Sequence, residues 1–267
     1  MANGSHWFSR TRSSLRLTRE LTVREVRGRL SQSTVGFLWL VVTPILLLGV
    51  YAFVFGVIFR ARAPVDFDFP FVVWLALGLW PWLAFSEATL RGAQAIRQHG
   101  ALISKISIDR SIIVSAVLSG TFLLHLVGYG IVLIVLELSG INLTWLGLPY
   151  ALMILCTLYG LTLGLGWMLC AVQVFIRDLE QLLPILFMLW FFLTPILYAP
   201  DLLPVNLQPL LFVNPMTWWI EELRAALIEG QVLPDRSFLV LVAGSVLMLV
   251  IGRWVFDRLS PYFEDFL

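Results

Sequence analysis

Three charged residues stand together between two strongly apolar runs of this chain. Arg177, Asp178 and Glu180 follow a run that ends near Phe175 and precede another that begins near Leu182. Charges between two such runs belong at a water interface, where they form either a solvated turn or a docking point for a partner protein. They are not typical of an active site, because no histidine or further metal ligand accompanies the two carboxylates.

Other residues with chemical potential do not predict catalysis or nucleotide binding. The only lysine, Lys105, follows Ser104 instead of a glycine, so the phosphate loop GxxxxGK[ST] is absent. The three histidines, His6, His99 and His125, are scattered, and the chain contains no HExxH or CxxC motif. We therefore expect no catalytic residue, no metal and no cofactor of the chain's own.

His125 lies within a predicted membrane span, where an ionisable side chain is a functional candidate by default. A hydrogen-bonded structural role is the simpler interpretation. Glu87, near the inner end of the preceding span, is placed to reach the membrane interface. The sequence does not show the paired intramembrane carboxylates that are typical of a proton relay.

Composition predicts the elements that hold these residues. Of 267 residues, 59% are hydrophobic and 13% are charged, whereas soluble domains carry about 25% charged residues. A run of about 20 apolar residues is long enough to cross a bilayer as a helix. We predict an all-α integral membrane protein that forms one domain over residues 1–267, with a cytoplasmic amphipathic segment at 1–33 and a six-span region at 35–256. The predicted transmembrane helices are Val35–Phe59, Phe69–Leu90, Ile112–Leu136, Leu148–Phe175, Leu182–Tyr198 and Phe238–Phe256.

Cation placement predicts that both termini are cytoplasmic. With that orientation, only four of the 18 lysines and arginines lie outside, namely Arg60, Arg62, Arg224 and Arg236. Cytoplasmic loops normally carry the excess of positive charge. The net charge of +1 gives no indication of nucleic acid binding.

The segments outside the spans predict interface elements. Residues Leu15–Leu30 interleave aliphatic side chains with arginines, as in a helix that lies flat among lipid head groups; a plain positively charged cytoplasmic tail is the alternative. Residues Gly92–Ser111 predict either a short amphipathic cytoplasmic helix or simple extensions of two spans. On the outer side, Asn214-Pro215 is a helix-start signal, and Met216–Glu229 predicts a re-entrant or interfacial helix. The proposed head-group contacts are Arg16, Arg19, Arg24 and Arg27, and the tryptophans expected to anchor at the outer interface are Trp218 and Trp219.

Aromatic residues are candidates for a conduit wall. Tyr51, Phe55 and Phe59 recur every four residues and therefore share one helix face. Trp190 and Phe191 add rings in the fifth predicted span. Such rings can stack on sugar faces, although lipid contact and packing are the alternative for each of them.

Four segments together resemble the ABC-2 type polysaccharide-export permeases. They are LTVREVRGRLSQSTVGFLWLVVTPILL, ALISKISIDRSIIVSA, RDLEQLLPILFMLWFFLTPILY and VNPMTWWIEELRAALIEG, which keep the family's order over nearly the whole chain. Asp109 stands where the family often has proline, and His99 where asparagine is common. The matching positions are Val35, Gly36, Phe37, Leu38, Trp39, Pro44, Thr194, Pro195, Ile196, Asn214, Pro215 and Arg224.

The resemblance implies a half-transporter in the bacterial inner membrane. Two such permease chains would pair with two copies of a cytoplasmic ATPase, which binds the ATP and Mg²⁺, and would export lipid-linked polysaccharide such as capsule or O-antigen. Membrane lipids, and periplasmic or outer-membrane export proteins, would be further partners. The outer helix would act as a gate that includes Asn214, Pro215, Trp218, Trp219 and Arg224. The residues expected to couple to the ATPase are Arg97, Lys105, Asp109, Arg110, Arg177, Asp178 and Glu180.

Two alternatives stay open at this point. The first is an ABC-2 half-transporter for a drug or a small lipid. The second is an integral-membrane enzyme that acts on lipid-linked sugars, which the lack of an acid–base cluster disfavours.

Overall fold

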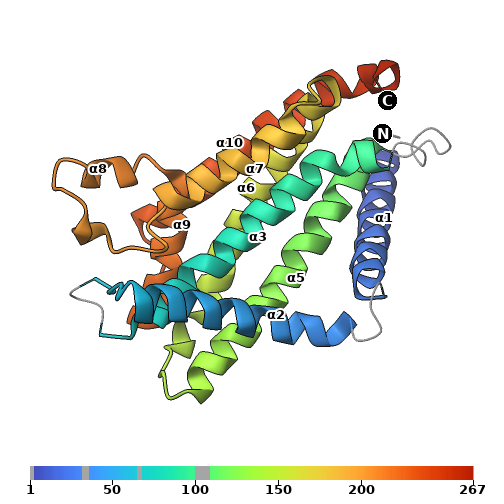
Figure 1. The fold of residues 1–267 in the computed structure, drawn as a ribbon. Helices are drawn as coiled ribbons and strands as arrows, with labels where there is room; N and C mark the ends of the chain where they lie inside the picture. The colour runs from blue at the N-terminus through green and yellow to red at the C-terminus, as the bar shows by residue number, and fades with distance from the viewer. Residues whose placement is uncertain (1–2, 32–35, 65–67, 100–108, 267) are drawn as a thin grey trace.

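The structure, a computed structural model, describes residues 3–31, 36–64, 68–99 and 109–266. The described residues form helices and connecting turns and contain no strand. Among the described residues, five helical segments are long and apolar enough to cross a membrane, and one shorter apolar helix accompanies them. The main helices in Figure 1 are α1 (Asn3–Ser31), α2 (Gly36–Tyr51), α3 (Phe71–Gln98), α5 (Arg110–Leu138), α6 (Leu148–Phe175), α7 (Leu179–Leu193), α8 (Gln208–Leu211), α9 (Pro215–Arg224) and α10 (Arg236–Leu259).

Local sequence signals explain where several helices begin. Asp109 caps α5 by accepting a hydrogen bond from the Ser111 amide, and Asp235 caps α10 by accepting from the Ser237 amide. Asn214 accepts from the Met216 amide with Pro215 in the first turn of α9, which confirms the predicted helix start. The π-helical turn Ala225–Glu229 extends α9 and ends at Gly230, whose φ of 72° favours glycine.

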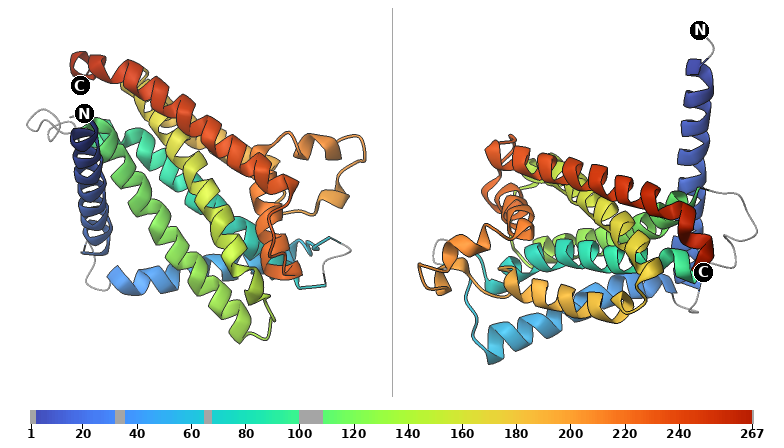
Figure 2. Two further views of the ribbon diagram at one scale, coloured as in Figure 1. Left: turned by 180° about the vertical axis from the view of Figure 1, so that it is seen from behind. Right: turned by 90° about the horizontal axis from the view of Figure 1, so that it is seen from above.

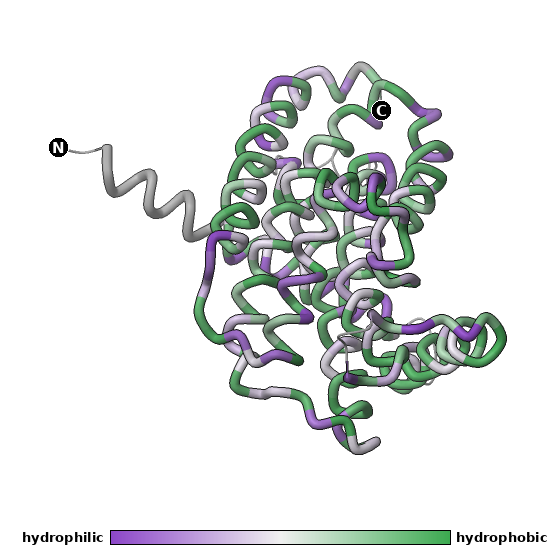
Figure 3. The backbone as a smooth tube through the Cα atoms, turned by 90° about the vertical axis from the view of Figure 1, so that its left-hand side faces the viewer, coloured by the Kyte–Doolittle hydropathy of each residue, from purple (hydrophilic) through white to green (hydrophobic). Residues whose placement is uncertain are grey.

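The bundle has a buried centre and two exposed flanks. α3 lies in the middle and packs against α5, α6, α7 and α9. α2 and α10 lie on opposite sides of it (Figure 2). Hydrophobic residues extend along the helices on these exposed sides as well (Figure 3), as expected where lipid or another chain replaces water.

α6 and α10 touch backbone to backbone. Gly164 on α6 faces Gly252 on α10, and a Cβ added to either glycine would overlap the main chain of the other helix. Only glycine permits so close an approach, and small residues commonly mark such contacts between membrane helices.

The fifth predicted span is shorter than expected. The prediction extended it to Tyr198, but α7 ends at Leu193, and Thr194 adopts an extended conformation. The reason is local: Pro195 lacks an amide donor and disfavours helical geometry in the residue before it. Thr194 and Ile196 are nevertheless fully buried, so the chain continues through the interior after the helix ends.

α1 is amphipathic, but polar side chains, and not only the predicted aliphatic ones, pack it against α5. The predicted head-group arginines Arg16, Arg19, Arg24 and Arg27 are all exposed. Thr22 and Glu25 instead lie against Gly120 of α5, and Arg29 donates to Thr121 over 2.6 Å. The helix is also longer than the predicted Leu15–Leu30 segment.

Candidate functional site

Ion pairs join the helix ends on the side of the bundle predicted to be cytoplasmic. Arg97, at the end of α3, contacts Glu180, at the start of α7, over 2.7 Å. Asp109, the cap of α5, lies 3.7 Å from Arg253 of α10. Four of the helix ends that would face an ATPase are therefore connected in pairs, and three of the predicted coupling residues take part.

The C-terminal turn Ser260–Asp265 holds the start of α5. Arg110 donates to the Ser260 carbonyl and pairs with the Glu264 carboxylate. Phe263 is fully buried between Phe175 of α6 and Phe256 of α10, and the Arg110 guanidinium lies 5.8 Å from its ring centre. The position of Arg110 is thus fixed by the chain's own C-terminal end.

The predicted turn between the fourth and fifth spans is confirmed. α6 ends at Phe175 and α7 begins at Leu179, so Arg177 and Asp178 occupy a tight, exposed connection. Neither side chain forms an ion pair within the described part of the chain, which leaves both charges available to a partner. Lys105, the remaining predicted coupling residue, lies outside the described residues.

On the opposite side of the bundle, Arg224 is almost completely buried. Its guanidinium lies 3.3 Å from the centre of the Trp74 ring and donates to the main-chain carbonyls of Trp74 and Pro195. Its side chain also contacts Glu221 over 2.8 Å. Burial lowers the pKa of Arg224 to about 10, and the Glu221 carboxylate opposes that shift. Arg224 therefore joins α9, α3 and the segment after α7.

Asn214 connects α9 to the end of α7. Its side-chain oxygen accepts from the Trp190 indole over 2.7 Å, and its nitrogen donates to the Thr194 hydroxyl over 2.8 Å. The structure thus brings together Asn214, predicted for the gate, and Trp190, predicted for the pathway. The Trp190 ring also packs on Phe85 and Trp82 of α3, and Phe191 packs on Trp82.

The prediction that Trp219 anchors at the head groups is wrong. Its side chain is buried and its indole donates to Thr157 of α6 over 3.0 Å. Helical spacing places it on the inner side of α9 together with Leu223, so packing within the bundle determines its environment. Trp218 is half-buried and donates to the Phe212 carbonyl.

The aromatic residues of the first span form a continuous column. The Tyr51 and Phe55 ring centres are 5.9 Å apart, and those of Phe55 and Phe59 are 5.6 Å apart. A π-helical turn from Ala52 to Ile58 carries this part of the span, and its wider turn keeps residues four apart adjacent. Tyr51 and Phe55 pack partly on the core, and Phe59 is exposed.

Sequence reasoning missed three partners of the predicted site residues. Trp74 binds Arg224 from 150 positions away in the sequence. Glu264 binds Arg110 from 154 positions away. No local pattern identifies such pairs. Arg253 was counted only as one more cytoplasmic charge.

Comparisons with known proteins agree over almost the whole chain. The family model for the ABC-2 type transporter matches residues 16–228. An "O-antigen export system permease protein RfbA" of Myxococcus xanthus is 29% identical over 247 residues, which cover 92% of this chain and 93% of the relative. A protein of the same name from Klebsiella pneumoniae is 26% identical over 250 residues, with the same coverage. A "Polysialic acid transport protein KpsM" of Escherichia coli is 26% identical over 239 residues, or 87% of this chain and 89% of the relative.

Proposed function

Because the chain belongs to the ABC-2 type transporter family, we propose that it is the membrane subunit of an exporter of lipid-linked polysaccharide, powered by a separate ATPase chain. The observation that carries this proposal is the nearly end-to-end similarity to permeases named for O-antigen export and polysialic acid transport. A drug or small-lipid substrate has no comparable support. As a transport subunit, the chain itself carries out no catalysis.

Six membrane crossings fit the structure if α7 and the residues after it count as one span. Fifteen helical residues extend about 22 Å, which is short of the roughly 30 Å hydrocarbon layer. The mostly buried segment from Thr194 to Ala199, which contains bends and a turn, would continue this crossing. Its carbonyl at Pro195 is satisfied by Arg224, as non-helical backbone within a membrane requires.

The ATPase would bind at the end of the bundle where Arg97 pairs with Glu180 and where Arg177 and Asp178 are exposed. This end is cytoplasmic in the orientation that the arginine distribution favours. Closure of the ATPase on ATP would shift the turn between α6 and α7. The Arg97–Glu180 pair would then pass this shift to α3.

A second copy of the chain would complete the conduit. α2 and α7 carry long exposed apolar surfaces, including Leu46, Val50, Ile185 and Leu189. The column of Tyr51, Phe55 and Phe59 would line the conduit. The outer gate would move only together with α3, because Arg224 attaches α9 to Trp74.

Co-purification with the ATPase tests the coupling assignment. We expect the double charge reversal Arg177→Glu/Asp178→Arg to abolish co-purification and export, because both side chains are exposed and the fold does not depend on them. The matched control is Asp201→Arg, an exposed carboxylate in the outer loop. Unchanged assembly and export in the double variant would disprove the docking site. ATP hydrolysis by the purified chain alone would disprove its role as a passive membrane subunit.

A further inference from the structure

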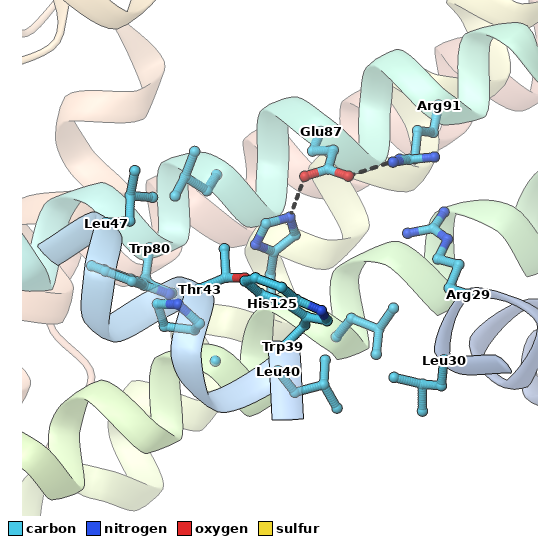
Figure 4. Close-up of a pocket in the computed structure, with 14 residues that line it drawn as sticks. Arg29, Leu30, Trp39, Leu40, Thr43, Leu47, Trp80, Glu87, Arg91 and His125 are labelled. Atoms are coloured by element: carbon cyan, nitrogen blue, oxygen red, sulfur yellow. Dashed lines mark hydrogen bonds and ion pairs between the residues drawn. The ribbon is translucent and has the colours of Figure 1, made fainter. Parts of the chain in front are cut away.

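A cavity of about 390 Å³ lies where the end of α1 and the start of α2 meet α3 and α5. Figure 4 shows Arg29, Arg91 and His125 around one side of this space, with Trp39 and Leu40 on the other. The proposed function uses none of these five residues. Trp39 is about half exposed, so the cavity opens beside the outer surface of α2.

A connected polar network forms one wall. Glu87 accepts from the His125 Nε2 over 2.8 Å and from the Arg91 Nε over 2.7 Å. Arg29 reaches the same wall from α1, with its Nε 3.2 Å from Glu25 and one terminal nitrogen bound to Thr121. Polar groups this close to the apolar interior require a function or a partner.

The groups that remain free are hydrogen-bond donors. Within the described residues, both terminal nitrogens of Arg91 and one of Arg29 have no hydrogen-bond partner, whereas each oxygen of Glu87 already accepts one bond. Burial and, second, the nearby charge of Arg91 lower the pKa of Arg29. An acceptor that carries negative charge would satisfy these donors and relieve the repulsion between the two guanidiniums. Phosphate suits the planar arginine fork.

The opposite wall is apolar except for Thr43. Trp39, Leu40, Pro44 and Leu47 of α2 face the polar network across the cavity. By helical rise, Arg91 lies about 10 Å and Glu87 about 16 Å from the end of α3 at Gln98. At 28 residues, α3 exceeds the hydrocarbon thickness by about 12 Å. With that excess at the Gln98 end, Arg91 lies in the head-group region and Glu87 about 4 Å deeper, at the edge of the hydrocarbon layer. A polar wall and an apolar wall at that depth fit an amphiphile better than a free ion.

We propose that this cavity binds the phosphate or diphosphate head group of a single membrane lipid, with Arg29 and Arg91 as its ligands and Trp39 against its hydrocarbon chain. Two sources share this chemistry, namely a polyprenyl carrier and an ordinary phospholipid. The assignment does not depend on which polymer the transporter moves.

Equilibrium binding to the purified full chain in non-ionic, phosphate-free detergent tests the proposal. The probes are farnesyl diphosphate and dioctanoyl phosphatidic acid, with inorganic diphosphate as the head group alone and farnesol as the chain alone. We expect at least one lipid phosphate to bind about tenfold or more tightly than both of these reference compounds. Preference for farnesyl diphosphate would indicate the carrier, and preference for dioctanoyl phosphatidic acid would indicate a phospholipid. Equal binding of the two would support a site that accepts either.

Variants identify the ligands. Loss of one charge-assisted contact in Arg91→Gln should weaken lipid phosphate binding about tenfold or more, and Arg29→Gln should do the same. Arg258→Gln, at an exposed position near the end of α10, is the matched control and should bind normally. Trp39→Ala should weaken binding of the lipids but not of inorganic diphosphate.

Two outcomes would overturn the site. One is equal affinity for farnesol and farnesyl diphosphate, which would show that the phosphate contributes nothing to binding. The other is normal lipid binding by Arg91→Gln in protein whose thermal midpoint matches that of the unmodified chain. Inorganic diphosphate binding as tightly as the lipids would overturn the assignment to a lipid.

Discussion

α2 and α3 are both apolar helices with an internal proline, yet they occupy opposite environments. In the most apolar window of each span, 83% of the residues of α3 are buried within the protein, against 6% for α2 and its π-helical extension. The more hydrophobic of the two is the exposed one, with a mean hydropathy of 2.5 against 1.4. Lipid is as apolar as leucine, so hydropathy does not drive one helix against another in a membrane.

Small and hydrogen-bonding residues mark the buried span instead. α3 carries Gly78 close to Arg224, Gly92 close to Leu118, and the Trp74 carbonyl that Arg224 needs. α2 carries Gly49 with open space around it and a surface of leucine, isoleucine and valine. The first pattern belongs to a helix held by its own chain, and the second to a helix that offers its surface to lipid, polymer or another copy.

The largest effect on stability should come from Arg224, which holds α3 to α9. Arg224→Met would leave the carbonyls of Trp74 and Pro195 without their donor and Glu221 without its cation. We expect a loss of about 3–5 kcal/mol in the free energy of unfolding, measured as a large drop in the thermal midpoint in detergent. Arg236→Met, at an exposed outer position, is the control. Similar midpoints for the two variants would show that α3 does not depend on this arginine.

A matched pair of glycines tests the two spans directly. A Cβ at Gly78 of α3 would lie 2.8 Å from a terminal nitrogen of Arg224, whose guanidinium is bound by Trp74, Pro195 and Glu221. Gly78→Ala should therefore cost about 1–3 kcal/mol. At Gly49 of α2 nothing lies within 4 Å, and Gly49→Ala should be neutral or stabilise by up to about 1 kcal/mol. The measurement is again the thermal midpoint. Equal shifts at the two positions would remove the proposed distinction between the spans.

The aromatic column at the end of the first span should matter for export more than for folding. Replacing Tyr51, Phe55 and Phe59 by alanine should reduce surface polymer about tenfold or more, if each ring contributes about 0.5–1.5 kcal/mol to the passing sugars. Stability should fall by only about 1–2 kcal/mol, because Phe59 is exposed and the other rings are only partly packed. Leu239→Ala/Val246→Ala, at exposed positions of α10, should export normally. Normal polymer in the triple variant would exclude the column from the pathway.

The smallest effect is expected at the exposed end of α3. Arg97 and Glu180 form a largely solvent-accessible pair, and such pairs contribute about 0–1 kcal/mol. Arg97→Gln should therefore leave the thermal midpoint nearly unchanged while weakening the link between α3 and the turn at Asp178. Reduced ATP-dependent export by stable, fully assembled Arg97→Gln transporter would support that link. Export at the normal rate would show that the pair transmits nothing.

Local signals in the sequence predicted much of this arrangement. The Asn214-Pro215 start of α9, the tight turn at Arg177 and the exposed arginines of α1 each depend on neighbouring residues, and each agrees with the structure. The end of α7 was also available locally, since Pro195 disfavours helix before it, but the apolar run around it suggested a longer span. The average hydropathy of this region did not reveal that Pro195 ends the helix.

Long-range pairings could not be predicted in this way. Arg224 was placed in an outer loop with access to water, because nothing near it in sequence indicates Trp74 or the Pro195 carbonyl. Arg110 likewise gave no sign of Glu264 at the far end of the chain. For His125 the hydrogen-bonded interpretation is confirmed by Glu87, whereas the neighbouring cavity depends on four helices that only the fold brings together.

The contact between Gly164 and Gly252 limits where cargo can go. Two helices whose main chains touch leave no seam for a sugar chain to enter, and separating them would expose bare backbone to lipid. We therefore expect α6, α10 and the C-terminal turn to move as one rigid unit. A passage is then expected to open elsewhere, as proposed for the surfaces of α2 and α7.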